Sequence, residues 1–268
     1  MQPERSNRAN PLTERLELPL LGRLLYRVVY GSIVAAFTIV SLELLYAVLR
    51  PSPRQEEFDP SDIFGDPENP HLKVAVLGDS TVTAPGVGGP HEIWVTHICR
   101  RLTAGYFVEL RSFAVGGSMA HNLIDDQLGP ALDFGPDLVI LSVGANDALK
   151  GVTPVRFEQN LDLLVSAFRE QGAVVVQSGV GDLGTIPRLF PPLATLLSRR
   201  ALTFNAAHER VAARHGSHVV PQRQSPVEVW DERHMWSDDL FHVSAKGHEV
   251  WGELGWRTVA VAMGLDES

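Results

Sequence analysis

Residues 72–80 read LKVAVLGDS, and this stretch decides how the rest of the sequence is interpreted. Its first six residues form a short apolar run, which is typical of a buried strand. Small and polar residues, Gly78, Asp79 and Ser80, follow at once. In sheets of parallel strands, ligands bind just outside the carboxyl ends of the strands. The stretch therefore predicts a buried strand that leads directly into a candidate functional site.

Similar apolar runs predict four further strands, at residues 107–115, 138–143, 173–177 and 218–221. Longer helical patterns separate them, near residues 91–103, 118–128, 154–171, 191–215 and 244–263. Pro154 near the start of one pattern and Gly172 after its end fit helix punctuation. Alternation of helices with almost continuously apolar strands predicts an α/β fold, in which helices cover both faces of a mainly parallel five-stranded sheet.

Polar residues follow these predicted strands as well as the first one. Gly116, Gly117 and Ser118 follow the second strand, and Gly144, Ala145, Asn146 and Asp147 follow the third. After the last strand and a longer loop comes Asp239-Leu240-Phe241-His242. Because the carboxyl ends of parallel strands share one edge of the sheet, these residues are expected to meet there.

The residue types at this edge suit acyl transfer. A serine hydroxyl such as that of Ser80 needs a base to become a good nucleophile, and the imidazole of His242 titrates near neutral pH. Asp239, three residues earlier, would accept from Nδ1–H of this imidazole and fix its tautomer. The backbone N–H groups of Ser80 and Gly117 and the side-chain amide of Asn146 would donate to the developing oxyanion.

In order and spacing these blocks resemble those of the SGNH (GDSL-type) hydrolase superfamily, over residues 72–262. The matching blocks are Gly78-Asp79-Ser80, Gly117, Gly144-x-Asn146-Asp147 and Asp239-x-x-His242. The resemblance implies a flavodoxin-like three-layer α/β/α sandwich. It also implies a catalytic triad of Ser80, Asp239 and His242, and an oxyanion hole of Ser80, Gly117 and Asn146. Residues 179–205 look similar to a lipolytic-esterase branch of the superfamily.

Two positions depart from the family pattern. Thr81 stands where the GDSL motif has leucine, and Ser112 stands five residues before Gly117, where many members have asparagine. Gly116 is the alternative to Gly117 for the oxyanion role.

Structural interpretations compete with the catalytic ones. Ser80 could cap a helix, and Asp79 and Asp147 are typical of turns and helix starts. His234 and His248 are interpreted as ordinary polar positions, and spacing to His242 favours Asp239 over Asp238. Residues 234, 238, 239 and 242 would also make a nitrogen and oxygen cluster, but no closed ligand set of the zinc type is present, so neither metal nor cofactor is expected.

Residues 28–49, VVYGSIVAAFTIVSLELLYAVL, are predicted to cross a membrane. The segment carries one charge, Glu43, and is long enough to span a bilayer. A buried core helix and a cleaved signal peptide are the alternatives, although the segment ends without an A-x-A cleavage pattern. Arginines are more frequent before the segment (residues 5, 8, 15, 23 and 27) than just after it (residues 50 and 54), which places the N-terminus in the cytoplasm and the catalytic domain outside.

The sequence thus divides into a cytoplasmic tail (1–27), a transmembrane anchor (28–49), a linker rich in Pro, Asp and Glu (50–71) and an SGNH hydrolase domain (72–268). A net charge of −9 argues against nucleic acid as a partner, and the single cysteine, Cys99, rules out a disulfide framework. The expected function is that of a membrane-anchored serine ester hydrolase acting on acyl esters. An envelope acyltransferase or carbohydrate deacetylase, and a non-catalytic membrane-tethered binding module, are the alternatives.

Overall fold

The structure is a computed structural model that describes residues 20–50, 55–222 and 232–265. The chain separates into two compact units, with the division between Tyr46 and Ala47, and each is described by itself. Most of the predicted cytoplasmic tail, together with Arg54, lies outside the described residues.

Helix α1 spans Leu20–Leu49, 30 residues, which corresponds to a length of about 45 Å. Within it, Gly22–Tyr46 is long and apolar enough to cross a membrane. Its large apolar side chains are exposed, with Phe37 at 75%, whereas a core helix would bury them. This exposure argues against the buried-core alternative.

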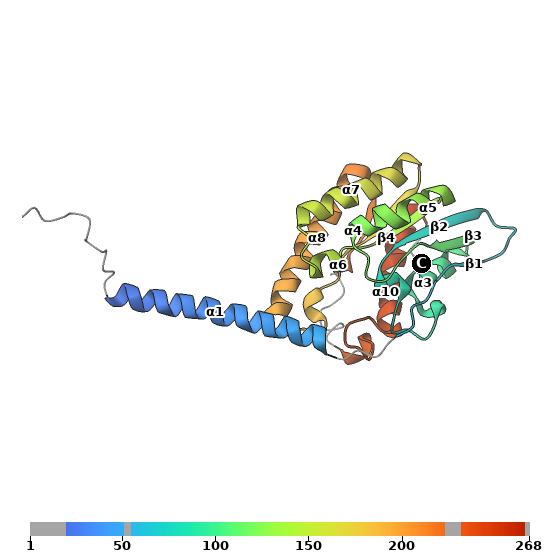
Figure 1. The fold of residues 1–268 in the computed structure, drawn as a ribbon. Coiled ribbons are helices and arrows are strands. Elements are labelled where there is room, and N and C mark those ends of the chain that lie inside the picture. Colours follow the sequence, from blue (N-terminus) through green and yellow to red (C-terminus); the bar gives the residue numbers. More distant parts are fainter. Residues whose placement is uncertain (1–19, 51–54, 223–231, 266–268) are drawn as a thin grey trace, which may run out of the picture. The chain divides into compact units, whose positions relative to one another are not determined.

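The second unit contains a six-stranded sheet in the order β1-β3-β2-β4-β5-β6 (Figure 1). Strand β1 is antiparallel to β3, and all other neighbouring pairs are parallel. The strands are β1 (Asp62–Phe64), β2 (His71–Gly78), β3 (Phe107–Ser112), β4 (Leu138–Ser142), β5 (Val174–Ser178) and β6 (His218–Val220). The mainly parallel sheet is confirmed, and its five predicted strands have the order 2-1-3-4-5 of flavodoxin-like folds.

Strand β1 is the one strand that was not predicted. It lies inside the segment predicted as a linker, and it is three residues long between stretches rich in Asp and Pro, so no apolar run marks it. Phe58 and Phe64 of this segment nevertheless pack against the hydrophobic core. The chain between α1 and β2 is therefore joined to the domain by strand pairing and by packing.

Helices cover both faces of the sheet. The helices of this unit are α2 (Ser80–Thr83), α3 (Trp94–Leu102), α4 (Ala120–Asn122), α5 (Leu128–Phe134), α6 (Ala145–Leu149), α7 (Pro154–Glu170), α8 (Leu193–His215) and α10 (Ala245–Met263). Short 3₁₀ or π turns lie at Pro90–Glu92, Leu123–Gln127, Leu183–Thr185 and Arg233–Met235. The predicted α/β/α arrangement is confirmed (Figure 1).

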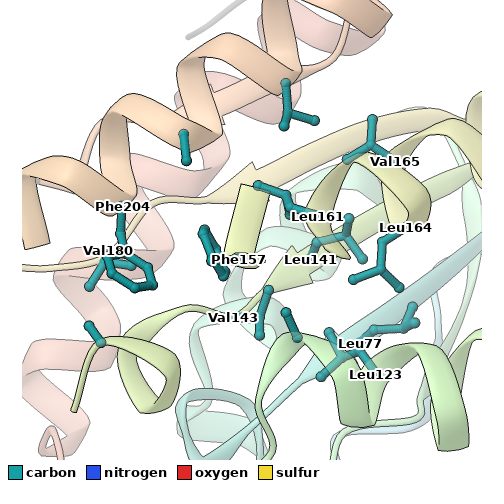
Figure 2. Close-up of a cluster of buried hydrophobic side chains, with 14 of the residues drawn as sticks. Leu77, Leu123, Leu141, Val143, Phe157, Leu161, Leu164, Val165, Val180 and Phe204 are labelled. Carbon is teal, nitrogen blue, oxygen red and sulfur yellow. The ribbon is translucent and has the colours of Figure 1, made fainter. Parts of the chain in front are cut away.

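Alternate residues of the central strands feed two separate cores. On β2, Ala75 and Leu77 face the helices α7 and α8, while Val74 and Val76 face α3 and α10. Figure 2 shows the first of these clusters, in which Leu77 and Leu141 of the sheet lie close to Leu161 and Leu164 of α7. Period-two alternation on a strand that is buried on both faces explains why most residues of the central strands are apolar.

The strand ends that precede the candidate site lie in register. Gly78 of β2 pairs with Ser142 of β4, Ser142 pairs with Ser178 of β5, and Ser178 pairs with Val220 of β6. A Cβ atom at Gly78 would lie 2.6 Å from the carbonyl oxygen of Ser142, so only glycine permits this close pairing. The residues after these four strand ends consequently start from one line across the edge of the sheet.

Two leucines on α7 test the burial of this helix. Leu161 is fully buried and Leu163 is 56% exposed. We expect Leu161→Ala to lower the free energy of unfolding by about 2–5 kcal/mol, because it leaves a cavity in the core. The matched variant Leu163→Ala is expected to change it by less than about 0.5 kcal/mol. Urea denaturation of the full chain measures both, and equal effects would contradict the packing of α7.

Candidate active site

A cavity of about 110 Å³ opens at the carboxyl edge of the sheet. Three of the predicted site residues line it: Ser80 after β2, Asn146 after β4, and His242 from the loop that precedes α10. Asp239 contacts His242 and does not line the cavity itself. Gly117 is also absent from the described residues that form the wall.

Ser80 is the first residue of α2, and its cap is the preceding residue. Asp79 accepts a hydrogen bond from the Thr81 amide at 2.9 Å and so caps this short helix. The Thr81 hydroxyl lies 2.6 Å from the Ser142 hydroxyl, and its carbonyl accepts from Trp94 Nε1 at 3.0 Å. The capping interpretation thus applies to Asp79, and Ser80 is left half-buried on the cavity wall.

Asp239 and His242 are joined by a short hydrogen bond between their side chains. His242 Nδ1 lies 2.6 Å from Asp239 Oδ2, and the Asp239 side chain is only 4% exposed. The other carboxylate oxygen accepts from the Ser237 hydroxyl at 2.7 Å and from the amides of Phe241 and His242 at 2.8 and 2.9 Å. Burial by itself raises the pKa of Asp239, but the hydrogen bonds from His242, Ser237 and the two amides outweigh it and hold this pKa well below its usual range. The carboxylate therefore stays charged and fixes the orientation of the imidazole.

The loop that carries this pair holds an unfavourable backbone conformation. Leu240 has φ of 61°, in the left-handed region that side chains other than glycine, Asn and Asp seldom adopt. The Ser237 amide donates to the His242 carbonyl at 2.8 Å and closes the loop around it. Backbone strain of this kind persists only where surrounding contacts fix it, and it is concentrated at functional sites.

Asn146 stands at the start of α6, directly after a sharp turn. Gly144 makes this turn with φ of 121°, and a Cβ atom there would lie 2.9 Å from both Phe157 and Val180. The Asn146 side-chain amide donates to Asp79 Oδ2 at 2.8 Å, which uses one of its two hydrogens. Asp79 thus orients Asn146 as well as capping α2, a role that no sequence signal indicated.

Asp79 differs electrostatically from Asp239, although both are buried. Burial raises the pKa of Asp79, and the hydrogen bonds from Thr81 and Asn146, together with the nearby His242, only partly oppose this effect. Asp79 receives fewer hydrogen bonds than Asp239.

Gly117 and Asp147 connect the loop after β3 to α6. Gly117 has φ of 78°, and its carbonyl accepts from Lys150 Nζ at 2.8 Å. Asp147 accepts from the Ala120 amide at 3.0 and 3.2 Å, which agrees with its structural interpretation. At the neighbouring position, a Cβ atom on Gly116 would lie 2.4 Å from a carboxylate oxygen of Glu57. The oxyanion role of Gly117 stays a prediction.

The rest of the cavity wall is largely apolar. It comes from residues that follow β4 and β5 and from the segments around His242, among them Val143, Leu149, Val180, Leu183, Ile186, Phe241 and Trp251. Trp236 also lines the cavity.

His248 was predicted to be an ordinary polar position, and the structure corrects this. The side chain is 1% exposed at the start of α10, lines the cavity, and accepts from the Trp94 amide through Nδ1 at 3.4 Å. Burial lowers the pKa of His248 to about 3, with a smaller contribution from repulsion by His97 and His242. The helical pattern of residues 244–263 could have indicated its burial, but not its contact with a residue 154 positions away.

In the described ranges, no cluster of three or more His, Cys, Asp or Glu side chains has the geometry to hold a metal ion. Cys99 is a free, buried cysteine in α3.

A model of the GDSL-like lipase/acylhydrolase family matches residues 76–250, which contain all the candidate site residues. The chain therefore belongs to the GDSL-like lipase/acylhydrolase family.

Two bacterial relatives extend this assignment. The chain is 30% identical over 191 residues to the GDSL-like esterase Rv1075c of Mycobacterium tuberculosis, an alignment that covers 68% of this chain and 60% of the relative. It is 26% identical over 147 residues to esterase TesA of Pseudomonas aeruginosa, covering 54% of this chain and 68% of TesA. The chain thus matches less than two thirds of the mycobacterial relative's length.

Solved structures confirm the fold. The crystal structure of TesA superposes with a TM-score of 0.60 at 24% identity, covering 71% of this chain and 99% of TesA. The psychrotrophic esterase EstA from Pseudoalteromonas sp. superposes with a TM-score of 0.59 at 16% identity, covering 72% of this chain and 99% of EstA.

The buried neutral His248 predicts a pH dependence of stability. Its pKa is about 3 in the folded chain and about 6.5 in the unfolded chain, so the unfolded chain binds one more proton between these values. Stability from this group is present above pH 6.5 and is lost as the pH falls towards 3, by about 1.4 kcal/mol for each pH unit. Between pH 6.5 and 5, we expect the free energy of unfolding to depend less steeply on pH in His248→Gln than in the parent.

The exposed His91 provides the control. In His91→Gln, the free energy of unfolding should change with pH as it does in the parent. Urea denaturation of the full chain at several pH values measures all three proteins. A slope that is unchanged in His248→Gln would contradict the buried neutral state.

Proposed function

We propose that the protein is a membrane-anchored serine ester hydrolase that forms an acyl-enzyme on Ser80. The observation that carries the proposal is that Ser80 and His242 line one cavity, while Asp239 is hydrogen-bonded to Nδ1 of His242. Family membership over residues 76–250 supports ester hydrolysis as the class of reaction.

In the proposed mechanism His242 acts first as a base. With Nδ1–H held by Asp239, the Nε2 atom is free to take the hydroxyl proton of Ser80 as the oxygen attacks the ester carbonyl. The imidazolium that forms is stabilised by the Asp239 carboxylate, and it then protonates the departing alkoxide. Water, activated by the same imidazole, releases the acid and restores Ser80.

Asn146 and the Ser80 amide are the proposed donors to the oxyanion, with Gly117 as the third. The bond from Asn146 to Asp79 supports this role, because it leaves one amide hydrogen available and fixes the plane of the side chain. A donor that is oriented before the reaction stabilises the tetrahedral intermediate without having to reorganise.

The apolar wall of the cavity supports acyl esters as substrates. Val180, Leu183 and Ile186 offer hydrocarbon surface beside Ser80, and the acyl chain would bury against it. Helix α1 supports membrane attachment, since a helix of this length with exposed apolar side chains would bury them in lipid.

Replacement of the proposed nucleophile tests the mechanism. Ser80→Ala is expected to lower kcat for short p-nitrophenyl esters by at least about a thousandfold, because the acyl-enzyme cannot form. Ser166→Ala on α7 serves as the control and should keep parental turnover. Turnover by folded Ser80→Ala within tenfold of the parent would contradict the mechanism.

Two other functions would give different results in the same assay. A parent that transfers the acyl group to an added alcohol in preference to water would be an acyltransferase. A folded parent without any turnover would be a binding module.

The orientation of the anchor is a separate prediction from the arginine bias around residues 28–49. An alkaline phosphatase fused after Ser268 is expected to be active, and a green fluorescent protein fused at the same place is expected to be dark, because the C-terminus would lie outside the cytoplasm. A fluorescent fusion together with an inactive phosphatase fusion would contradict this orientation, because both results would place the C-terminus in the cytoplasm.

A further inference from the structure

The chain that follows α1 reaches the loop of the Asp239–His242 pair at two points. Gln55 donates through Nε2 to the Ser237 hydroxyl at 3.2 Å. The guanidinium of Arg188 donates to the Asp239 carbonyl at 3.2 Å and also to the Arg50 carbonyl. Both contacts join residues that precede the family match to the loop that carries the proposed catalytic pair.

The contact at Ser237 continues to the Asp239 carboxylate. A serine hydroxyl has one hydrogen, and Ser237 gives it to Asp239 Oδ1 at 2.7 Å. Its oxygen is therefore left to accept, which is what the Gln55 amide requires. The hydrogen bonds run in one direction, from Gln55 to Ser237 to Asp239.

Packing at Gln55 indicates a role in positioning. Its Oε1 atom is buried and makes no hydrogen bond within the part of the chain that the structure describes, which is a cost to stability. A Cβ atom at Gly86 would lie 2.5 Å from Ser237 Cβ and 3.3 Å from Gln55 Oε1. Three segments that are distant in sequence, around Gln55, Gly86 and Ser237, thus meet at Ser237.

The same stretch of chain also contacts the helix that bears Ser80. The Phe58 amide donates to the carbonyl of Thr83, the last residue of α2, at 2.8 Å. A few residues later, β1 pairs with β3. The stretch is thus fixed to the domain and contacts both the nucleophile helix and the loop of the base.

We propose that the residues just after α1 brace the catalytic loops, with Gln55 and Arg188 as positioning residues for Asp239 and His242. This inference rests on the proposed ester hydrolase function. Leu240, with φ of 61° between Asp239 and His242, makes the loop dependent on such support. Arg188 holds the backbone before Leu240, and Gln55 holds the Ser237 oxygen in the direction that donates to Asp239.

Glutamate at position 55 gives a sharp test, because it keeps the size of glutamine and replaces the donor by an acceptor. Ser237 would then turn its hydrogen away from Asp239. We expect Gln55→Glu and Gln55→Ala to lower kcat for a short ester by about threefold to tenfold, as for loss of one hydrogen bond, with KM unchanged. The neighbouring exposed residue provides the control, and Glu56→Gln should match the parent.

A double-mutant cycle separates positioning from general stability. In a Ser237→Ala background the route from Gln55 to Asp239 is already broken, so adding Gln55→Ala should change kcat no further. Arg188→Lys, which keeps the charge but loses the planar fork that serves two carbonyls, is expected to lower kcat as well. Additive effects of the Gln55 and Ser237 changes would overturn the relay.

Amide hydrogen exchange gives a readout that does not need catalysis. In full-length Gln55→Ala, the amides of Phe241 and His242 should exchange several times faster than in the parent, while those of β4 keep their rates. Unchanged exchange at these two amides would overturn the brace even if the parent were inactive. An inactive parent with faster exchange in the variant would overturn the proposed hydrolase function and retain the brace.

Discussion

Four parallel strands that end in register are the constraint on which the candidate site depends. Gly78, Ser142, Ser178 and Val220 lie in one line across the sheet, so the segments that follow them start at the same edge. This register brings Ser80 and Asn146, which are far apart in the sequence, to the wall of one cavity. The close approach of β2 to β4 at Gly78 is part of the constraint, since a side chain there would push the two strands apart.

Two buried carboxylates at the candidate site show how hydrogen bonding affects the charge of a carboxyl group. Asp239 accepts from Ser237, from two amides and from His242, and its pKa is held low despite burial. Among the described residues, Asp79 accepts side-chain hydrogen bonds from Thr81 and Asn146, and burial raises its pKa. The first arrangement suits a permanent negative charge beside an imidazole. The second suits a carboxyl group whose main task is to hold Asn146 and the start of α2 in place.

Much of the architecture could be predicted because buried strands are recognisable in the sequence as short apolar runs. Each of the five predicted strands was found within two residues of its expected start, since strands covered by helices on both faces are mostly apolar. Strand β1 was missed because an edge strand of three residues needs no apolar run. In the site, Asp239 and His242 could be paired from their spacing because the contact is local.

Contacts between distant residues were beyond sequence reasoning. His248 contacts Trp94, and Asp79 orients Asn146. In each pair the two residues are far apart in the sequence. Gln55 lies in a polar stretch whose composition predicted a linker, yet its amide contacts Ser237. Such positions are identified only when the three-dimensional neighbours are known, because a single polar residue carries no periodicity.

Covalent labelling of the full-length protein with a fluorophosphonate tests the central claim most directly, because the reagent reports an activated serine without assuming a substrate. Intact mass and peptide mapping are expected to show one adduct per chain, on the Ser80 hydroxyl, with much slower labelling in His242→Ala. Folded protein that remains unlabelled, or an adduct on a different serine, would contradict the assignment of Ser80 as the nucleophile.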